Sequence, residues 1–243
     1  MSRRGVFGIL VGGMAASLGG CGSRDSARYK VIVEVDTPVG PRSGFAVREV
    51  RYPSGGNWFP FGESRGQAKL NGEAVAIDLP NDMVLFALLR SDTDVDHANA
   101  IPMSLLSTSD GKPINGPVLL WPEGGQHRSL RKMSAPMLVS FRDVSDPTTV
   151  IRVAPDDPAA TLGPGFAIRK IAVQRTEEPI TKSIESRLSW WHLYENRQLD
   201  GSRYNNSNSM ANIINRRDFA QGLSNLGRDS SAAGRGYAKR LAA

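Results

Sequence analysis

Short apolar segments separated by glycine, proline, asparagine and aspartate divide the central part of the chain, and this pattern limits the folds open to it. In residues 29–35, apolar side chains occupy every second position, which is typical of a strand with one buried face. Residues 37–44 contain two prolines and two glycines. They predict a turn that returns the chain as an antiparallel strand over residues 45–52.

A second hairpin is predicted around Asn71-Gly72, which lies between residues 67–70 and 73–79. Asn-Gly favours a type I′ turn, because both central positions of that turn need positive φ. Residues 80–82 then reverse the chain into a nearly continuous apolar run at 83–89, which we place in the centre of a sheet. Further strands are expected at residues 118–121, 137–141, 150–153 and 166–174.

Helices are expected mainly towards the C-terminus. A turn or two of helix is predicted at residues 159–162, and a longer helix at 179–193, where Ile180, Ile184, Leu188 and Trp191 share one face. We expect an α+β fold that is mainly antiparallel β, a sandwich or a curled sheet, with one or two C-terminal helices. Residues 29–199 would form this β-rich domain. Residues 200–243 would form a polar, basic and partly disordered tail, with a marginal helix near 210–226.

The formal charge of +6 is concentrated at the two ends of the chain. Residues 1–20 carry two arginines and no acid, and residues 181–243 carry ten basic against five acidic side chains. Residues 21–180 are nearly neutral, with eighteen basic and nineteen acidic side chains. The central body therefore lacks the basic field that nucleic-acid binding requires, and no nucleic-acid partner is expected.

Residues 1–20 have the three parts of a secretory signal peptide: a basic start, an apolar stretch and small residues before a cleavage site. The stretch is short and rich in glycine, which is unsuited to a permanent membrane span. It ends at Cys21, the single cysteine of the chain. One cysteine excludes a disulfide scaffold and a zinc site built on thiolates.

The residues Leu18-Gly19-Gly20-Cys21 resemble the lipobox of bacterial lipoproteins. The resemblance implies that Cys21 receives a diacylglycerol and becomes the mature N-terminus, with residues 21–28 as the lipidated cysteine and its tether. Two or three acyl chains would anchor the protein in a membrane. Gly22, where an aspartate would indicate retention in the inner membrane, favours the periplasmic side of the outer membrane. The alternative is an ordinary signal peptide cleaved elsewhere, with Cys21 incidental.

A second resemblance covers about half of the chain. It rests on segments near Pro136, Asp146-Pro147, Pro155-Asp156-Asp157, Gly163-Pro164-Gly165 and Trp190-Trp191. Together they look like a family of proteobacterial proteins, several of them predicted lipoproteins. This resemblance implies no activity and no catalytic residue.

One candidate for a metal site is the alternating series Asp92, Asp94 and Asp96, because a calcium loop uses oxygen ligands at alternate positions. The match ends there: His97 stands where an EF-hand loop needs glycine, and Met103 stands where it needs a bidentate glutamate. The alternative is a solvated acidic loop in which Asp96 caps a short helix towards Leu106. No cofactor is expected.

No catalytic motif is present in the sequence. His97, His127 and His192 do not have a metal-ligand spacing, and the chain contains no nucleophile elbow, Walker loop or dinucleotide fingerprint. Trp190-Trp191 could anchor a partner or contact a membrane surface, although the more common arrangement buries Trp191 and leaves Trp190 partly exposed.

The expected function is a lipid-anchored binding or structural module of the cell envelope that faces the periplasm, with an envelope protein as its partner. The rival interpretations are a hydrolase that uses Asp92–Asp96 or Glu123 with His127, and a carrier of a small ligand. An exposed edge strand would favour the binding module, and convergence of these acids in a pocket would favour the enzyme.

Overall fold

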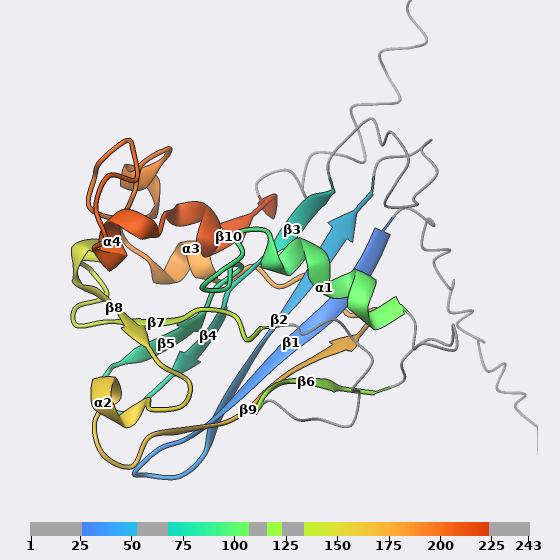
Figure 1. Cartoon of the computed structure of the whole chain (residues 1–243), viewed down its shortest axis with the longest axis horizontal. Helices are drawn as coiled ribbons and strands as arrows, with labels where there is room; N and C mark the ends of the chain where they lie inside the picture. The colour runs from blue at the N-terminus through green and yellow to red at the C-terminus, as the bar shows by residue number, and fades with distance from the viewer. Residues whose placement is uncertain (1–25, 53–67, 107–115, 123–133, 224–243) are drawn as a thin grey trace, which may run out of the picture.

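The computed structural model describes residues 26–52, 68–106, 116–122 and 134–223 (Figure 1). Within them, two antiparallel sheets have the strand orders β10-β3-β2-β1-β9-β6 and β4-β5-β7-β8. The expected β-rich α+β fold is confirmed. The strands are β1 (Ser26–Asp36), β2 (Arg42–Arg51), β3 (Lys69–Glu73), β4 (Val75–Asp78), β5 (Val84–Ala87), β6 (Val118–Trp121), β7 (Leu138–Phe141), β8 (Val150–Val153), β9 (Ala167–Arg175) and β10 (Ala220–Gln221).

The helices are short. They are α1 (His97–Leu106), α2 (Ala159–Leu162), α3 (Ile184–Arg187) and α4 (Met210–Ile213), with 3₁₀ turns η1 (Pro147–Thr149), η2 (Trp191–Tyr194) and η3 (Arg216–Asp218). In Figure 1, α1 crosses the larger sheet, where it contacts β1, β3 and β9. No helix among the described residues has the length and apolar character needed to cross a bilayer.

The hairpin of β1 and β2 forms the centre of the larger sheet, as the alternation in residues 29–35 predicts. Gly40, with φ of 114°, closes its turn and donates its N–H to the Thr37 carbonyl at 3.0 Å. One boundary differs from the expectation. Ser26 already pairs with Arg51, so residues 26–28 belong to β1 and the expected tether to residue 28 is too long.

The hairpin predicted at Asn71-Gly72 is wrong, because the chain does not turn there. Asn71 lies within β3 and pairs with Glu49 of β2. After the single residue Ala74, the chain enters the smaller sheet as β4. The pair of positive φ angles occurs instead at Asn81 (59°) and Asp82 (58°), between β4 and β5.

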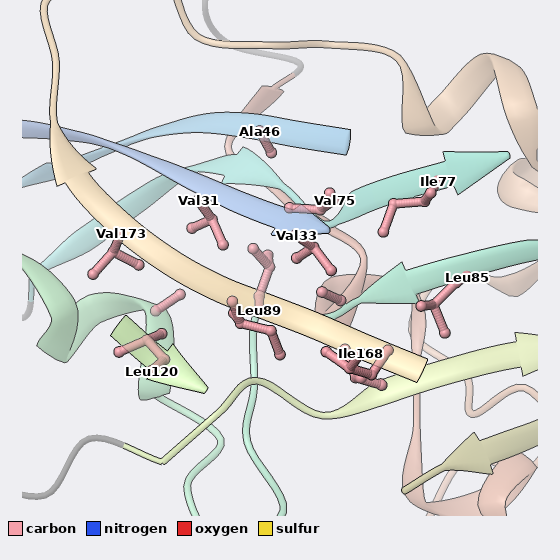
Figure 2. Close-up of a cluster of buried hydrophobic side chains, with 14 of the residues drawn as sticks. Val31, Val33, Ala46, Val75, Ile77, Leu85, Leu89, Leu120, Ile168 and Val173 are labelled. Carbon is pink, nitrogen blue, oxygen red and sulfur yellow. The ribbon is translucent and has the colours of Figure 1, made fainter. Parts of the chain in front are cut away.

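The main core lies between the two sheets (Figure 2). β5 is buried on both faces, as predicted for a central strand: Leu85 and Ala87 point into this core, whereas Phe86 and Leu88 point to the opposite side. In Figure 2, side chains from both sheets converge on the same space; those labelled are Val31, Val33, Ala46, Val75, Ile77, Leu85, Leu89, Leu120, Ile168 and Val173.

A second core covers the other face of the smaller sheet and is rich in aromatic rings. Phe86 packs on both Phe141 and Phe219, with ring centroids 5.7 and 5.5 Å away, and these two rings also contact each other. Trp190 packs on both Phe141 and Phe219, and its indole N–H donates to the Val144 carbonyl at 2.9 Å. These rings join the smaller sheet to segments near the C-terminus.

The long helix predicted for residues 179–193 is wrong over most of its length. Only α3 and η2 form, and Leu188 between them has extended backbone angles. A continuous helix would place Trp190 about 200° around the axis from Leu188, on the solvent side. The break allows Trp190 and Trp191 to be buried together, with exposures of 2% and 4%.

Residues 200–223 are part of the fold and not of a tail. Ile214 and Phe219 are completely buried, and β10 pairs with β3. Of the marginal helix expected near residues 210–226, the described residues 210–223 form only α4 and the 3₁₀ turn η3. Residues 224–243 lie outside the described part of the chain.

Candidate binding cleft

Several sequence-predicted site residues lie outside the described ranges. They are the lipidation residue Cys21, the lipobox residues Leu18, Gly19 and Gly20, and the pair Glu123 and His127. Lipidation of Cys21 therefore stays a prediction.

Asp92, Asp94 and Asp96 lie on an exposed loop between β5 and α1, and each carboxylate has a different partner. Asp92 accepts a hydrogen bond from Arg152 at 2.6 Å, and Asp94 accepts one from the backbone N–H of Asp96 at 2.9 Å. Asp96 immediately precedes α1. Among the described residues, no group of three histidine, cysteine or acidic side chains is arranged to hold a metal ion.

His97 and the two tryptophans are buried and do not form an exposed site. His97 is 4% exposed at the start of α1. The pKa of His97 is lowered to about 4. Burial is the largest cause, and the positive charge of Arg48 acts in the same direction, whereas the negative charge of Asp94 opposes them. The expectation that Trp190 is partly exposed is wrong, so neither tryptophan offers a surface anchor. His192 is exposed.

Arg48 is a fully buried cation that sequence reasoning missed. Its Nε donates to the Glu73 carbonyl at 2.8 Å, and its Nη2 donates to the Ala87 carbonyl at 3.4 Å. The Glu73 carbonyl lies where the chain passes from the larger to the smaller sheet, and the Ala87 carbonyl lies at the end of β5. Arg48 therefore joins the two sheets, and it has no carboxylate partner among the described residues. In the sequence, Arg48 lies two positions from both Ala46 and Val50, so alternation places all three on the same face of β2. This spacing was the signal that Arg48 is buried.

A cleft of about 690 Å³ lies beside β2 and differs from these buried groups in being open to solvent. β2 supplies one wall, β4 a second, and the segment 181–187 a third. The lining residues are Arg42, Ser43, Gly44, Phe45, Glu73, Ala74, Ala76, Asp78, Leu79, Thr181, Lys182, Ser183 and Arg187.

The strand switch from β3 to β4 leaves one edge of β2 open at this cleft. β3 pairs only with residues 49–51 of β2. Thr181 covers the next rung, because its N–H donates to the Val47 carbonyl at 3.3 Å and its hydroxyl accepts the Val47 N–H at 3.2 Å. Backbone groups alternate between the two edges of a strand, so those of Phe45 and Ser43 point to the same edge as those of Val47. No described residue pairs with them there.

Gly44 allows β2 to cross closely over β4 at the cleft. A Cβ on Gly44 would lie 2.7 Å from the Ala76 carbonyl oxygen and 2.8 Å from a side-chain carbon of Ile77. Any larger residue would separate the strands. The crossing therefore depends on the glycine, and it sets the position of the open edge relative to β4.

The acidic groups of the cleft are already engaged by neighbouring donors. The buried carboxylate of Glu73 accepts hydrogen bonds from the Ser183 N–H at 2.6 Å, the Ser183 hydroxyl at 3.1 Å and the Ile184 N–H at 2.9 Å. Asp78 pairs with Arg187 through contacts of 2.6 and 3.1 Å. The hydrogen bond from Arg187 lowers the pKa of Asp78.

Two basic groups at the cleft remain available to an occupant. Arg42 and Lys182 are exposed and form no ion pair with a described residue. Phe45, which is 52% exposed, lies over the ammonium group of Lys30 at 4.2 Å. The described residues of the lining include no histidine or cysteine, and they offer the groups of a binding surface: backbone groups that no described residue pairs, two cations and one aromatic ring.

Comparison with known proteins gives no relative from which a function could be transferred. No family model, no curated protein and no solved structure matches the chain.

Proposed function

We propose that this chain is a lipid-anchored binding module of the cell envelope, which faces the periplasm and holds a partner protein in the cleft beside β2. The observation that carries the proposal is the edge of β2 at Ser43 and Phe45, with which no described residue pairs. Exposed strand edges bind extended segments of other proteins through main-chain hydrogen bonds. They also lead to aggregation unless they are protected. An open edge within a charged cleft is therefore better explained as the binding site of a specific partner.

The signal segment and lipobox support the proposed location. Only residues 22–25 separate Cys21 from the start of β1. Five backbone steps span at most about 18 Å, so an acyl chain on Cys21 would hold the folded domain close to the membrane surface. Gly22 favours the outer membrane, and a partner would then be a protein at or near that surface.

Two measurements test the anchor. Mass spectrometry of the mature N-terminal peptide should find a diacylglycerol, or a diacylglycerol and an N-acyl chain, on Cys21. Cys21→Ser should move the protein from the membrane fraction to the soluble fraction of the cell. An unmodified thiol in a protein that washes freely from membranes would contradict the anchor.

Site-specific photo-crosslinking in intact cells tests the cleft. A benzophenone amino acid at position 45 should give one crosslinked product of defined mass, which mass spectrometry can identify. Tyr204 is 76% exposed and does not line the cleft, so the same probe at position 204 is the matched control. Products at both positions, or at neither, would contradict a binding site beside β2.

A further inference from the structure

The residues that line the cleft indicate the chemistry of its occupant as well as where the occupant would bind. Thr181 already forms hydrogen bonds to the backbone of Val47 at this edge of β2. A strand added beside Phe45 and Ser43 would continue the same row of hydrogen bonds along the edge. A neighbouring strand lies about 4.8 Å away in the hydrogen-bonding direction. The volume of about 690 Å³ is within the range of sites that enclose a bound group.

The described lining of the cleft has a small excess of positive charge, with three basic against two acidic side chains. Glu73 is 1% exposed and accepts three hydrogen bonds, and Asp78 is paired with Arg187, so neither carboxylate is free to bind a cationic group of an occupant. Arg42 and Lys182 form no ion pair within the described part of the chain and lie on the walls of the cleft. An occupant that carries carboxylates is therefore favoured over a neutral or basic one.

The same charges argue against a second copy of this chain at the edge. Edge-to-edge pairing of two β2 strands would bring Arg42 and Lys182 of both copies together. Like charges that face each other across a strand pair are destabilising, and basic residues at strand edges commonly prevent self-association.

We infer that the cleft binds an extended acidic peptide segment of a partner protein, which adds to the larger sheet as a strand beside Ser43 and Phe45. This inference rests on the proposed function and specifies its ligand. The N–H and C=O groups of both residues pair with the main chain of the segment. Arg42 and Lys182 attract its carboxylates, and the exposed ring of Phe45 contacts an apolar side chain on the facing position.

Peptide binding to the full-length protein, purified in detergent, tests the ligand class. The probes are two fluorescein-labelled heptapeptides, one alternating glutamate with valine and one alternating lysine with valine. Fluorescence anisotropy should give an affinity for the glutamate peptide at least about tenfold higher, the effect of two surface ion pairs. The preference should weaken at about 0.5 M NaCl, where such pairs are screened. Equal affinities for the two peptides would overturn the inference.

Variants at the edge test the binding mode. Ser43→Pro removes an N–H that no described residue accepts, and it should reduce the affinity for the glutamate peptide by about tenfold. The double variant Arg42→Glu/Lys182→Glu should reverse the preference between the two peptides. Arg142→Glu/Arg197→Glu is the matched control, because both arginines are exposed and neither lines the cleft. Full binding by Ser43→Pro would overturn strand addition.

A measurement on the wild-type protein keeps the inference testable if Ser43→Pro does not fold. Strand addition should slow hydrogen exchange of the Phe45 amide when the glutamate peptide is bound, and unchanged exchange would overturn it.

A dimer in analytical ultracentrifugation that Ser43→Pro abolishes would instead assign the edge to a second copy. Failure of peptide binding with the crosslink at position 45 retained would refute the acidic ligand alone. Loss of both would refute the binding module as well.

Discussion

Gly72 lies so close to the side chain of Arg48 that a Cβ on Gly72 would be only 2.7 Å from Arg48 Cγ. The glycine is therefore required by the buried arginine and not by a turn. With only a hydrogen at position 72, Arg48 reaches the Glu73 carbonyl and joins the two sheets where β3 becomes β4.

Gly72→Ala should lower the free energy of unfolding by about 1–3 kcal/mol, because the added methyl group must displace Arg48 or β3. Urea denaturation followed by tryptophan fluorescence measures the change. Lys69→Ala is the control on the same strand. Its side chain is exposed, and it should change the stability by less than about 0.5 kcal/mol. A Gly72→Ala protein as stable as the wild type would show that Arg48 can move freely.

Arg48→Met should raise the pKa of His97. Burial is the larger cause of its low value of about 4, and the charge of Arg48 adds to it. Removal of that charge leaves burial in place, so the pKa of His97 should rise but stay below its ordinary value of 6.5. An NMR titration of the His97 ring measures the shift. An unchanged pKa would place Arg48 outside electrostatic reach of the imidazole.

Acid should destabilise the fold through His97. The unfolded chain protonates His97 near pH 6.5 and the folded chain only near pH 4, so stability is lost as the pH falls between these values, by about 3 kcal/mol in total. Burial raises the pKa of Asp218, which acts in the opposite direction. Urea denaturation at several pH values should therefore show a steeper loss for wild type than for His97→Gln. Parallel pH profiles would contradict the assignment.

Glu73→Gln should lower the free energy of unfolding by about 2 kcal/mol, because the carboxylate accepts hydrogen bonds from Ser183 and Ile184 at a buried site. An amide group cannot accept all of these bonds. Hydrogen exchange at Ile184 should become faster in the variant, as α3 loses its attachment. Glu185→Gln, an exposed change within α3, is the matched control and should have neither effect.

Phe219→Ala should lower the free energy of unfolding by about 3–5 kcal/mol, because it opens a cavity among Phe86, Phe141 and Trp190. Tyr204→Ala removes an aromatic ring that is 76% exposed in the same part of the chain, and it should have little effect. Thermal unfolding of both variants measures the difference. Equal melting temperatures would indicate that residues 200–223 behave as a tail.

The sequence predicted strands better than turns, and the region around Asn71-Gly72 shows why. Asn-Gly has the same local preferences wherever it occurs, but here Asn71 pairs with Glu49 of β2 and Gly72 pairs with Gln221 of β10, and both partners are remote in the sequence. The chain reversal predicted at residues 80–82 does form, with positive φ at Asn81 and Asp82.

The C-terminal part shows the same limit for helices and tails. The spacing of Ile184, Leu188 and Trp191 correctly indicated burial, but not the broken path that brings them there. Residues 200–223 are polar on average, yet a few apolar side chains among them complete the second core. Composition alone does not show that Phe219 packs on Phe86, because the partner is remote in the sequence.

Consecutive residues were sufficient to place most strands, to make β5 a central strand and to single out Cys21, because alternation, apolar runs and signal motifs are properties of neighbours in the chain. The cleft could not be found in this way. An open edge exists only because β3 leaves β2 for the other sheet while Thr181 covers a single rung. Both events depend on contacts between residues far apart in the sequence, and these contacts are made only in the folded protein.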